Sequence, residues 1–329
     1  MSSLAPLLQS FFTDRLIRQR QASDNTIAAY RDTLRLLIVF ATQQTGKPPS
    51  SLAITDVDTQ MIAAFLDHLQ TGRHNSIRTR NARLAAIHSL FRYAALAHPE
   101  HAQLIQRVLS IPPKRFETNI VTYLTEPEVD ALLAAPDQTT WIGRRDHALL
   151  QLACQTGLRA SEVTGLTIDD LHLGTSPHVS CVGKGRKQRI TPLTTTTVSV
   201  LKGWLAEHAG APADPVFATR RGTALSRDAL ARLVSRHAAV AATSCPTLIE
   251  KNVTPHTLRH TAAMRLLAAG IDSTVLALWL GHASTNTVQI YIHADLALKE
   301  RALARTAPHD APPGRYQPDD TILAFLNTL

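Results

Sequence analysis

The sequence predicts a mainly α-helical protein with a small antiparallel sheet, divided into two domains. Three observations lead to this prediction. The chain has 329 residues, more than a single hydrophobic core usually supports. Apolar side chains recur three and four residues apart through most of it, as in helices with one buried face. Two short strand-like runs, 178–182 and 187–191, flank a glycine-rich turn, which is typical of a β-hairpin.

The first domain is expected to span residues 1–111 and to be entirely helical. It contains only two glycines, Gly46 and Gly72, and its apolar residues keep a helical spacing. Ser23 and Thr55 are the predicted N-caps of two helices, because their hydroxyls accept hydrogen bonds from unpaired backbone N–H groups. The pattern predicts helices at about 4–20, 24–44, 56–71, 75–97 and 99–109.

Positive charge is concentrated in the first third of the chain. The formal net charge is +8, of which residues 1–117 carry +6 and the remainder +2. A basic excess of this kind favours a polyanionic partner, most simply a nucleic acid. Helical spacing turns Ile77 inward and leaves the nearby arginines outward, so we expect DNA contacts from Arg78, Arg80 and Arg83. A solvated helix face is the competing interpretation for any one of them.

Residues 112–121 are predicted to be a linker. Pro112 and Pro113 are incompatible with a helix interior. Lys114 and Arg115 follow them, and we expect this pair to contact a DNA backbone where the linker crosses it.

The second domain is expected to span residues 122–310, mostly as helices around the small hairpin. Helices are predicted at about 125–135, 142–156, 158–163, 194–208, 226–242, 256–269, 273–280 and 286–304. Residues 311–329 form a separate tail that ends in a short amphipathic helix. Such a helix is not stable alone, so its apolar face is expected to dock on this subunit or on a neighbouring one.

Several classes of protein are disfavoured. The apolar runs are shorter than a membrane span, and the N-terminus lacks a signal-peptide pattern, so we expect a cytoplasmic protein. The three cysteines form no CxxC pair. His256 and His260 have metal-ligand spacing, but Thr257 stands where a zinc protease has glutamate. We therefore predict no metal site.

The stretch from 256 to 291 concentrates groups that suit phosphate chemistry. Thr254 and Pro255 mark the start of a helix. His256, Arg259 and His260 then lie on one side of its first turns. His282 follows the helix break at Gly281, and Tyr291 lies nine residues further on.

These residues belong to a set of motifs that resembles the tyrosine recombinase (phage integrase) family, most closely its Xer-type and integron-type bacterial members. The resemblance covers roughly residues 5–305 and implies an N-terminal SAM-like core-binding domain followed by an α+β catalytic domain. The motifs that carry it are Thr156-Gly-Leu-Arg159-Ala-Ser-Glu162, Val182-Gly-Lys184-Gly, His256-Thr-Leu-Arg259-His260, Leu280-Gly-His282 and Ile290-Tyr291.

The resemblance implies a role for each group. Tyr291 is the nucleophile that attacks a DNA phosphodiester and forms a 3′-phosphotyrosine. Arg159 and Arg259 hold the non-bridging oxygens, and Lys184 protonates the leaving 5′-oxygen. The histidines His256 and His282 hydrogen-bond the phosphate or move the tyrosine proton, and His260 and Glu162 position other groups. Arg186 and Lys187, beside Lys184, are expected to contact DNA. No cofactor, metal or ATP is required.

The partners implied are double-stranded DNA with an inverted-repeat core site and three further subunits. The expected assembly is a homo-tetramer on two DNA sites, or a hetero-tetramer with a related recombinase, away from any membrane. Two alternatives remain: a non-catalytic DNA-binding relative, and a type IB topoisomerase-like enzyme that cleaves without synapsis. The first alternative is expected to lack one of the six catalytic groups, and all six are present.

Overall fold

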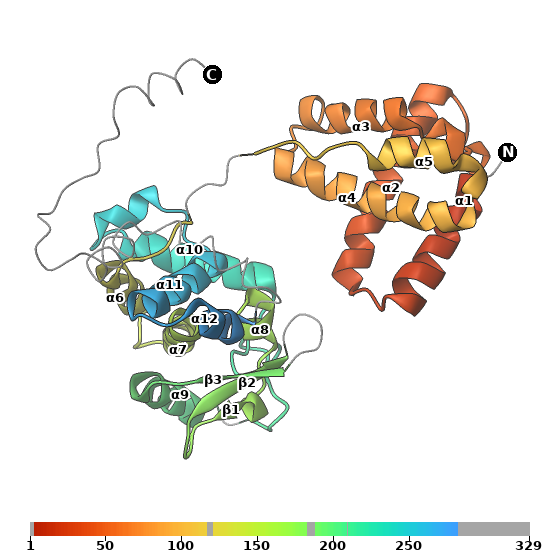
Figure 1. Ribbon diagram of the computed structural model, residues 1–329. Coiled ribbons are helices and arrows are strands. Elements are labelled where there is room, and N and C mark those ends of the chain that lie inside the picture. Colours follow the sequence, from red (N-terminus) through yellow and green to blue (C-terminus); the bar gives the residue numbers. More distant parts are fainter. Residues whose placement is uncertain (1–2, 117–120, 183–187, 209, 282–329) are drawn as a thin grey trace, which may run out of the picture. The chain divides into compact units, whose positions relative to one another are not determined.

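The computed structural model describes residues 3–116, 121–182, 188–208 and 210–281. The chain divides into two compact units, residues 1–118 and 119–329. Over the described residues it is mainly helical and carries one three-stranded antiparallel sheet, in the second unit (Figure 1). The predicted fold class is confirmed.

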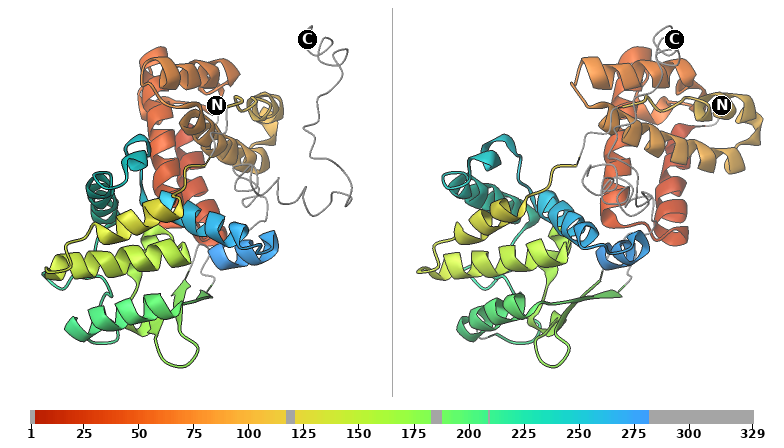
Figure 2. Two further views of the ribbon diagram at one scale, coloured as in Figure 1. Left: turned by 90° about the vertical axis from the view of Figure 1, so that its left-hand side faces the viewer. Right: turned by 60° about the vertical axis from the view of Figure 1, so that its left-hand side comes forward.

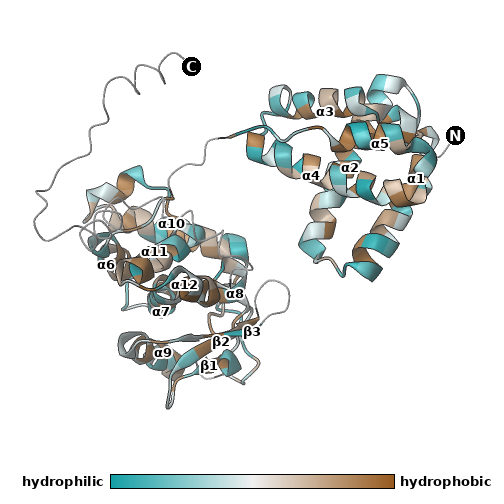
Figure 3. Ribbon diagram, in the orientation of Figure 1, coloured by the Kyte–Doolittle hydropathy of each residue, from teal (hydrophilic) through white to brown (hydrophobic). Residues whose placement is uncertain are grey.

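The N-terminal unit is a bundle of amphipathic helices. In Figure 3 its ribbons change between apolar and polar positions along each helix. The apolar faces meet in one core, in which Phe11, Phe65 and Phe91 are almost fully buried. The elements are α1 Leu4–Ser10, η1 Phe11–Gln19, α2 Asp24–Thr45, η2 Pro49–Ser51, η3 Ile54–Asp56, α3 Thr59–Thr71, α4 Ile77–Ala97, η4 Pro99–His101 and α5 Ala102–Leu109.

The predicted N-cap at Ser23 is confirmed, whereas the one at Thr55 is wrong. The Ser23 hydroxyl accepts from the backbone N–H of Thr26. Helix α3 begins at Thr59, and its cap is Asp58, whose carboxylate accepts from the N–H of Met61 at 2.8 Å. Thr55 lies one turn earlier, in the short helix η3. Two capping residues three positions apart both fit the sequence rule, and in the structure the later one caps α3.

The C-terminal unit is built around α7. Its side chains at Leu149, Leu150 and Leu152 are fully buried, and the helix packs between α11 and α9 (Figures 1 and 2). The helices are α6 Glu126–Ala134, α7 Trp141–Thr156, α8 Ala160–Gly165, η5 Ile168–Asp170, α9 Thr195–Glu207, α10 Arg227–Ala241, η6 Pro246–Glu250, α11 Pro255–Ala268 and α12 Ser273–Leu280.

The sheet contains the predicted hairpin and one strand that was not predicted. Strands β2 His178–Val182 and β3 Gln188–Pro192 pair antiparallel, with Ser180 opposite Ile190. Strand β1, Leu171–His172, pairs with the start of β2. Two residues are too few to show a strand period in the sequence, so this strand is detectable only through its partner.

No helix among the described residues has the length and apolarity needed to cross a membrane. The helices predicted for residues 286–304 and for the tail lie outside the described residues.

Candidate active site

The candidate site lies in the C-terminal unit, where the ends of α7 and α12 meet α11. Helix α7 ends at Gly157, which has φ 64° and terminates the helix in the left-handed conformation. Arg159 follows two residues later as the N-cap residue of α8, and Arg259 lies in the second turn of α11. Trp279 of α12 donates its indole N–H to the Thr156 carbonyl at 3.0 Å, which ties α12 to the end of α7.

Arg259 is buried at the end of two helices. Its residue is 2% exposed. One terminal nitrogen, Nη1, donates to the Gly157 carbonyl and the other, Nη2, to the Leu280 carbonyl, each at 2.6 Å. The carbonyls at a helix C-terminus carry partial negative charge, and a guanidinium is a favourable partner for them.

Arg159 reaches the same end of α12. Its Nη2 donates to the Gly281 carbonyl at 2.9 Å, and its Nη1 donates to Glu162 Oε1 at 2.9 Å. Its side chain is 29% exposed, so it is open in part to solvent. The two arginines of the predicted pair therefore converge on adjacent carbonyls at the end of α12, directly before His282.

Glu162 is the acid at the centre of this cluster. Its side chain is 4% exposed, and it pairs with Arg159 and with Arg189, the latter at 2.7 Å. Its Oε2 also accepts from the backbone N–H of Arg159 at 2.7 Å. Burial acts to raise the pKa of Glu162, but that hydrogen bond and the charges of Arg189 and Arg159 outweigh it and leave the pKa below its usual value. The predicted positioning role of Glu162 beside Arg159 is consistent with this geometry.

Arg189, on β3, belongs to this cluster but was not among the predicted site residues. Its sequence neighbours are a polar and an apolar residue of an ordinary strand, so no local pattern marks it. Its burial and its partners appear only once the hairpin packs against α8 and α12.

The two histidines of α11 lie side by side. The rings of His256 and His260 are 4.1 Å apart between centroids and meet edge to face. The pKa of His256 is lowered from its usual 6.5, first by desolvation from the surrounding atoms, although the residue keeps an exposed surface, and then by the positive charges of Arg259 and Arg159. His256 is therefore a neutral imidazole near pH 7 and can donate or accept a hydrogen bond there.

The other predicted groups lie outside the described residues: Lys184, Arg186 and Lys187 between β2 and β3 in the sequence, and His282 and Tyr291 after α12. Their roles stay predictions.

In the N-terminal unit, the prediction that Arg80 faces outward is wrong. Arg80 is 5% exposed, and its Nη1 donates to the Asn81 side chain and to the Pro112 carbonyl. Arg78 is exposed, and its guanidinium carbon lies 5.5 Å from the centre of the Phe116 ring. Arg83 is half-buried, and burial followed by the nearby charge of Arg73 lowers its pKa.

Helix α4, which carries these arginines, also makes hydrogen bonds to the start of the linker. The side-chain amide of Asn81 donates to the Lys114 carbonyl at 2.8 Å and accepts from the Lys114 N–H at 3.0 Å. The Lys114 ammonium donates to Gln70 at 2.6 Å, and Arg115 is exposed. Helical spacing alone could not reveal that α4 has a second covered face, because the residues that cover it are some 30 positions further along the chain.

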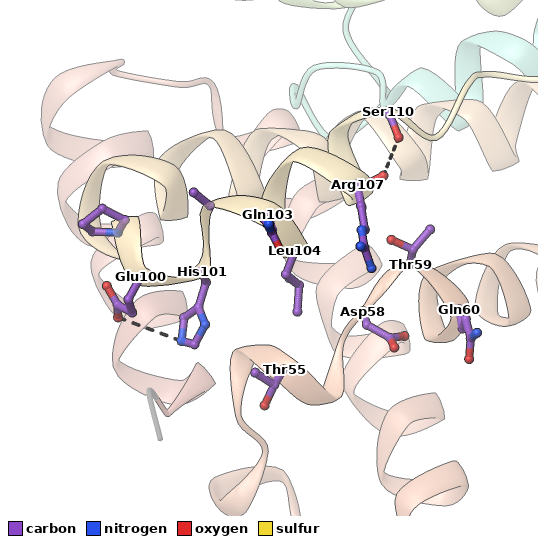
Figure 4. A pocket seen from close by; sticks show the side chains of 12 residues that line it. Thr55, Asp58, Thr59, Gln60, Glu100, His101, Gln103, Leu104, Arg107 and Ser110 are labelled. Carbon is purple, nitrogen blue, oxygen red and sulfur yellow. Dashed lines mark hydrogen bonds and ion pairs between the residues drawn. The ribbon is translucent and has the colours of Figure 1, made fainter.

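A hollow of about 810 Å³ opens in the N-terminal unit between the start of α3 and α5 (Figure 4). Asp58 lines it but already accepts from the N–H of Met61. Arg107, Glu100 and His101 line it as well. None of the predicted catalytic or DNA-contact residues is among the lining residues, so this hollow is separate from the predicted chemistry.

Comparison with known proteins assigns both units. Residues 122–297 match the phage integrase family, and residues 10–98 match the phage integrase N-terminal SAM-like domain. The y4rC protein of Sinorhizobium fredii is 54% identical over 328 residues, covering 100% of this chain and 99% of that protein. The tyrosine recombinase XerC of Pelobacter propionicus is 33% identical, covering 89% of this chain and 93% of its own.

Solved structures show the same likeness. The XerH site-specific recombinase, in a post-cleavage complex with a palindromic difH substrate, is 25% identical with a TM-score of 0.70. That match covers 88% of this chain and 82% of XerH. From matches of this extent, we conclude that the chain belongs to the phage integrase family, the tyrosine recombinases.

Proposed function

We propose that the protein is a site-specific recombinase that cleaves DNA with Tyr291, holds the cut strand as a 3′-phosphotyrosine and rejoins it to a new partner strand. The observation that carries the proposal is the convergence of Arg159 and Arg259 on the last carbonyls of α12. The two guanidiniums come from distant parts of the chain, and a phosphodiester is the ligand that such a pair suits.

The arginines are proposed to stabilise the charge of the pentavalent phosphorus. Arg159 presents a partly exposed guanidinium to the non-bridging oxygens. Arg259 acts from a buried position, where the low dielectric constant strengthens its field. Neutral His256 supplies a hydrogen bond without adding a further positive charge.

The nucleophile and the general acid are proposed from sequence position. A tyrosine hydroxyl ordinarily has a pKa near 10, so Tyr291 needs the cationic cluster to become a good nucleophile. In cleavage, His256 or His282 accepts the phenol proton, the tyrosine oxygen bonds to phosphorus, the bond from phosphorus to the 5′-oxygen breaks, and Lys184 gives that oxygen a proton. The reverse step rejoins the strand, so the phosphodiester bond energy is conserved.

The described residues support placing these groups near the cluster. Lys184 is five positions before Arg189, whose side chain lies in the cluster, and five extended residues span at most about 17 Å. His282 directly follows Gly281, which already accepts from Arg159.

The proposed partner is double-stranded DNA with inverted half-sites, bound by four subunits on two sites in the cytoplasm. The subunits are either all copies of this chain or include a related recombinase. The complex of XerH with a palindromic substrate supports inverted half-sites. The exposed residues Arg78, Lys114 and Arg115 remain proposed DNA contacts in the N-terminal unit, together with half-buried Arg83. Arg186 and Lys187 are proposed contacts of the hairpin tip.

The apolar tail is proposed to dock on a neighbouring subunit. Deleting residues 316–329 is then expected to leave binding and cleavage of one site intact and to weaken synapsis. Normal recombination by the truncated protein would exclude that role.

A nicked DNA substrate tests the proposed reaction. The binding site is first mapped by footprinting on DNA beside the protein's own gene. A nick near the scissile phosphate releases a short fragment on cleavage and traps the covalent adduct. Wild type is expected to form the adduct, Tyr291→Phe to form none, and the control Tyr316→Phe to retain it.

The outcomes also separate the alternatives. An adduct that persists in Tyr291→Phe contradicts the nucleophile assignment. Binding without an adduct in wild type indicates a non-catalytic relative. Cleavage and relaxation of supercoiled DNA without any strand exchange between two sites indicates a topoisomerase-like activity.

A further inference from the structure

Arg189 has a largely buried side chain and lies on β3, the strand that begins four positions after Lys184. Its side chain is 9% exposed, although its neighbours Gln188 and Ile190 on β3 are exposed. Burying a cation away from water is costly unless a partner compensates its charge. Nothing in the local sequence of β3 compensates this charge, so the partners of the side chain show what makes its burial possible.

The first partner of Arg189 is the acid that also holds Arg159. Its Nη1 donates to Glu162 Oε1 at 3.0 Å and its Nη2 to Glu162 Oε2 at 2.7 Å. This two-bond geometry needs the planar fork of a guanidinium and fixes the plane of the carboxylate. Glu162 Oε1 is the same atom that accepts from Arg159 Nη1.

The second partner is the carbonyl that also holds Arg259. Arg189 Nη1 donates to the Leu280 carbonyl at 3.0 Å, and Arg259 Nη2 donates to the same oxygen at 2.6 Å. Arg189 thus shares one acceptor atom with Arg159 and another with Arg259.

Gly281 allows this approach. Its backbone has φ 63°, and a side-chain Cβ at this position would overlap Nη1 of Arg189. A residue without a side chain is therefore needed where the end of α12 meets the guanidinium.

We propose that Arg189 is a positioning residue for strand cleavage: it fixes Glu162, and through it Arg159, while holding the Leu280 carbonyl that orients Arg259. The inference rests on the proposed function and adds a residue to it. Because Arg189 is on β3, it also connects the strand next to Lys184 to the arginine pair. We expect it to act on the rate of cleavage rather than on affinity for DNA, because its guanidinium is engaged with protein groups.

The test compares Arg189→Gln and Arg189→Lys with the control Arg145→Gln. Arg145 is buried in the same way: its side chain is 8% exposed, pairs with buried Asp146 at 2.7 Å and donates to the Ala218 carbonyl at 3.0 Å, and it contacts none of the site residues through these bonds. Single-turnover cleavage of the nicked substrate is measured at saturating protein, and DNA affinity is measured separately. Loss of a group that orients a metal ligand typically costs a metalloenzyme about 10–100-fold in activity, and we expect a loss of the same order for a group that orients an arginine. We expect that loss of cleavage rate in Arg189→Gln with unchanged affinity for DNA, and little change of either in Arg145→Gln.

Arg189→Lys separates charge from geometry. Lysine keeps the positive charge but cannot make the two-bond contact, and is expected to restore folding stability more fully than cleavage rate. If Arg189→Lys restores both equally, the geometric role is contradicted.

A neutral substrate distinguishes positioning from general damage. In DNA whose scissile phosphate has a methyl group in place of one non-bridging oxygen, the phosphate is uncharged and depends less on the orientation of the arginines. The ratio of wild-type to Arg189→Gln cleavage rates is expected to fall on this substrate. An equal loss on both substrates, or a wild-type rate in Arg189→Gln, would overturn the proposal.

Failure of the proposed function has a different signature. If wild type itself forms no covalent adduct, the recombinase reaction is wrong and this inference falls with it. If wild type forms the adduct and Arg189→Gln does so at the same rate, only the role of Arg189 is wrong.

Discussion

Loss of the Glu162 charge is expected to destabilise the C-terminal unit. Its carboxylate has 4% exposure and compensates the charges of Arg159 and Arg189. Glu162→Gln keeps the shape of the side chain but removes the charge, which leaves Arg189 buried without a counter-ion. Removing one partner of a buried pair costs about 3–5 kcal/mol. We expect the lower end, about 3 kcal/mol, because the Arg159 side chain is 29% exposed and partly solvated.

Urea denaturation followed by tryptophan fluorescence measures this cost. All three tryptophans, Trp141, Trp204 and Trp279, lie in the second unit, so the signal reports its unfolding and not that of the N-terminal unit. With an m-value of about 2–3 kcal/mol per M, a loss of ~3 kcal/mol lowers the urea midpoint by about 1–1.5 M.

Glu207→Gln is the matched control. Glu207 pairs with Arg144 at 2.7 Å, but the side chains are 37% and 33% exposed, and such surface pairs contribute about 0–1 kcal/mol. Equal midpoint shifts in the two variants would refute the claim that burial makes the Glu162 pair important.

The pH dependence gives an independent check. Because the pKa of Glu162 is lowered in the folded protein, its stabilising effect is complete above the usual value of 4.5 and is lost as the pH falls through the lowered pKa. The stability difference between wild type and Glu162→Gln is therefore expected to be constant near neutrality and to shrink in acid. A difference that grows on acidification would contradict the assigned charge state.

Three further changes test the geometry. Gly281→Ala is expected to lose more stability than Gly270→Ala in the same urea assay. Both glycines have positive φ, which costs about 1–2 kcal/mol with a side chain, but only Gly281 would also meet a neighbouring side chain; equal losses would contradict this. Asn81→Ala removes both hydrogen bonds to the Lys114 backbone. The loss of ~1 kcal/mol of local stability is expected to speed tryptic cleavage after Lys114 about 5-fold. An unchanged cleavage rate would show that this contact does not hold the linker. In an NMR titration the His256 ring is expected to titrate below 6.5, and Arg159→Ala to raise that pKa by removing a like charge; a fall would reverse the assigned cause.

The helices could largely be predicted from the sequence because the causes of helix formation are local. Apolar spacing and capping residues act within a few positions, and Ser23, Thr254 and Gly281 mark helix ends as expected. Where two local signals competed, as at Thr55 and Asp58, the sequence did not decide between them. A strand of two residues carries too little pattern to be detected at all.

The identity of the chemistry was also accessible from the sequence. The resemblance to the family depended on residue types and on their order along the chain, at Arg159, Lys184, Arg259, His282 and Tyr291. The match to the phage integrase family confirms that resemblance.

Side-chain surroundings were decided only by the tertiary structure. Arg80 and Arg78 are two residues apart and look alike in the sequence. Only Arg80 is buried, and it donates to a linker carbonyl 32 positions away. Arg189 gains its role from Glu162 and Leu280, which are 27 and 91 positions away. Electrostatic and hydrogen-bonding partners of a buried charge come from segments that meet only after folding. The sequence therefore determined which candidate groups for phosphate chemistry the protein has, and the fold determined which charges are buried and with which groups they pair.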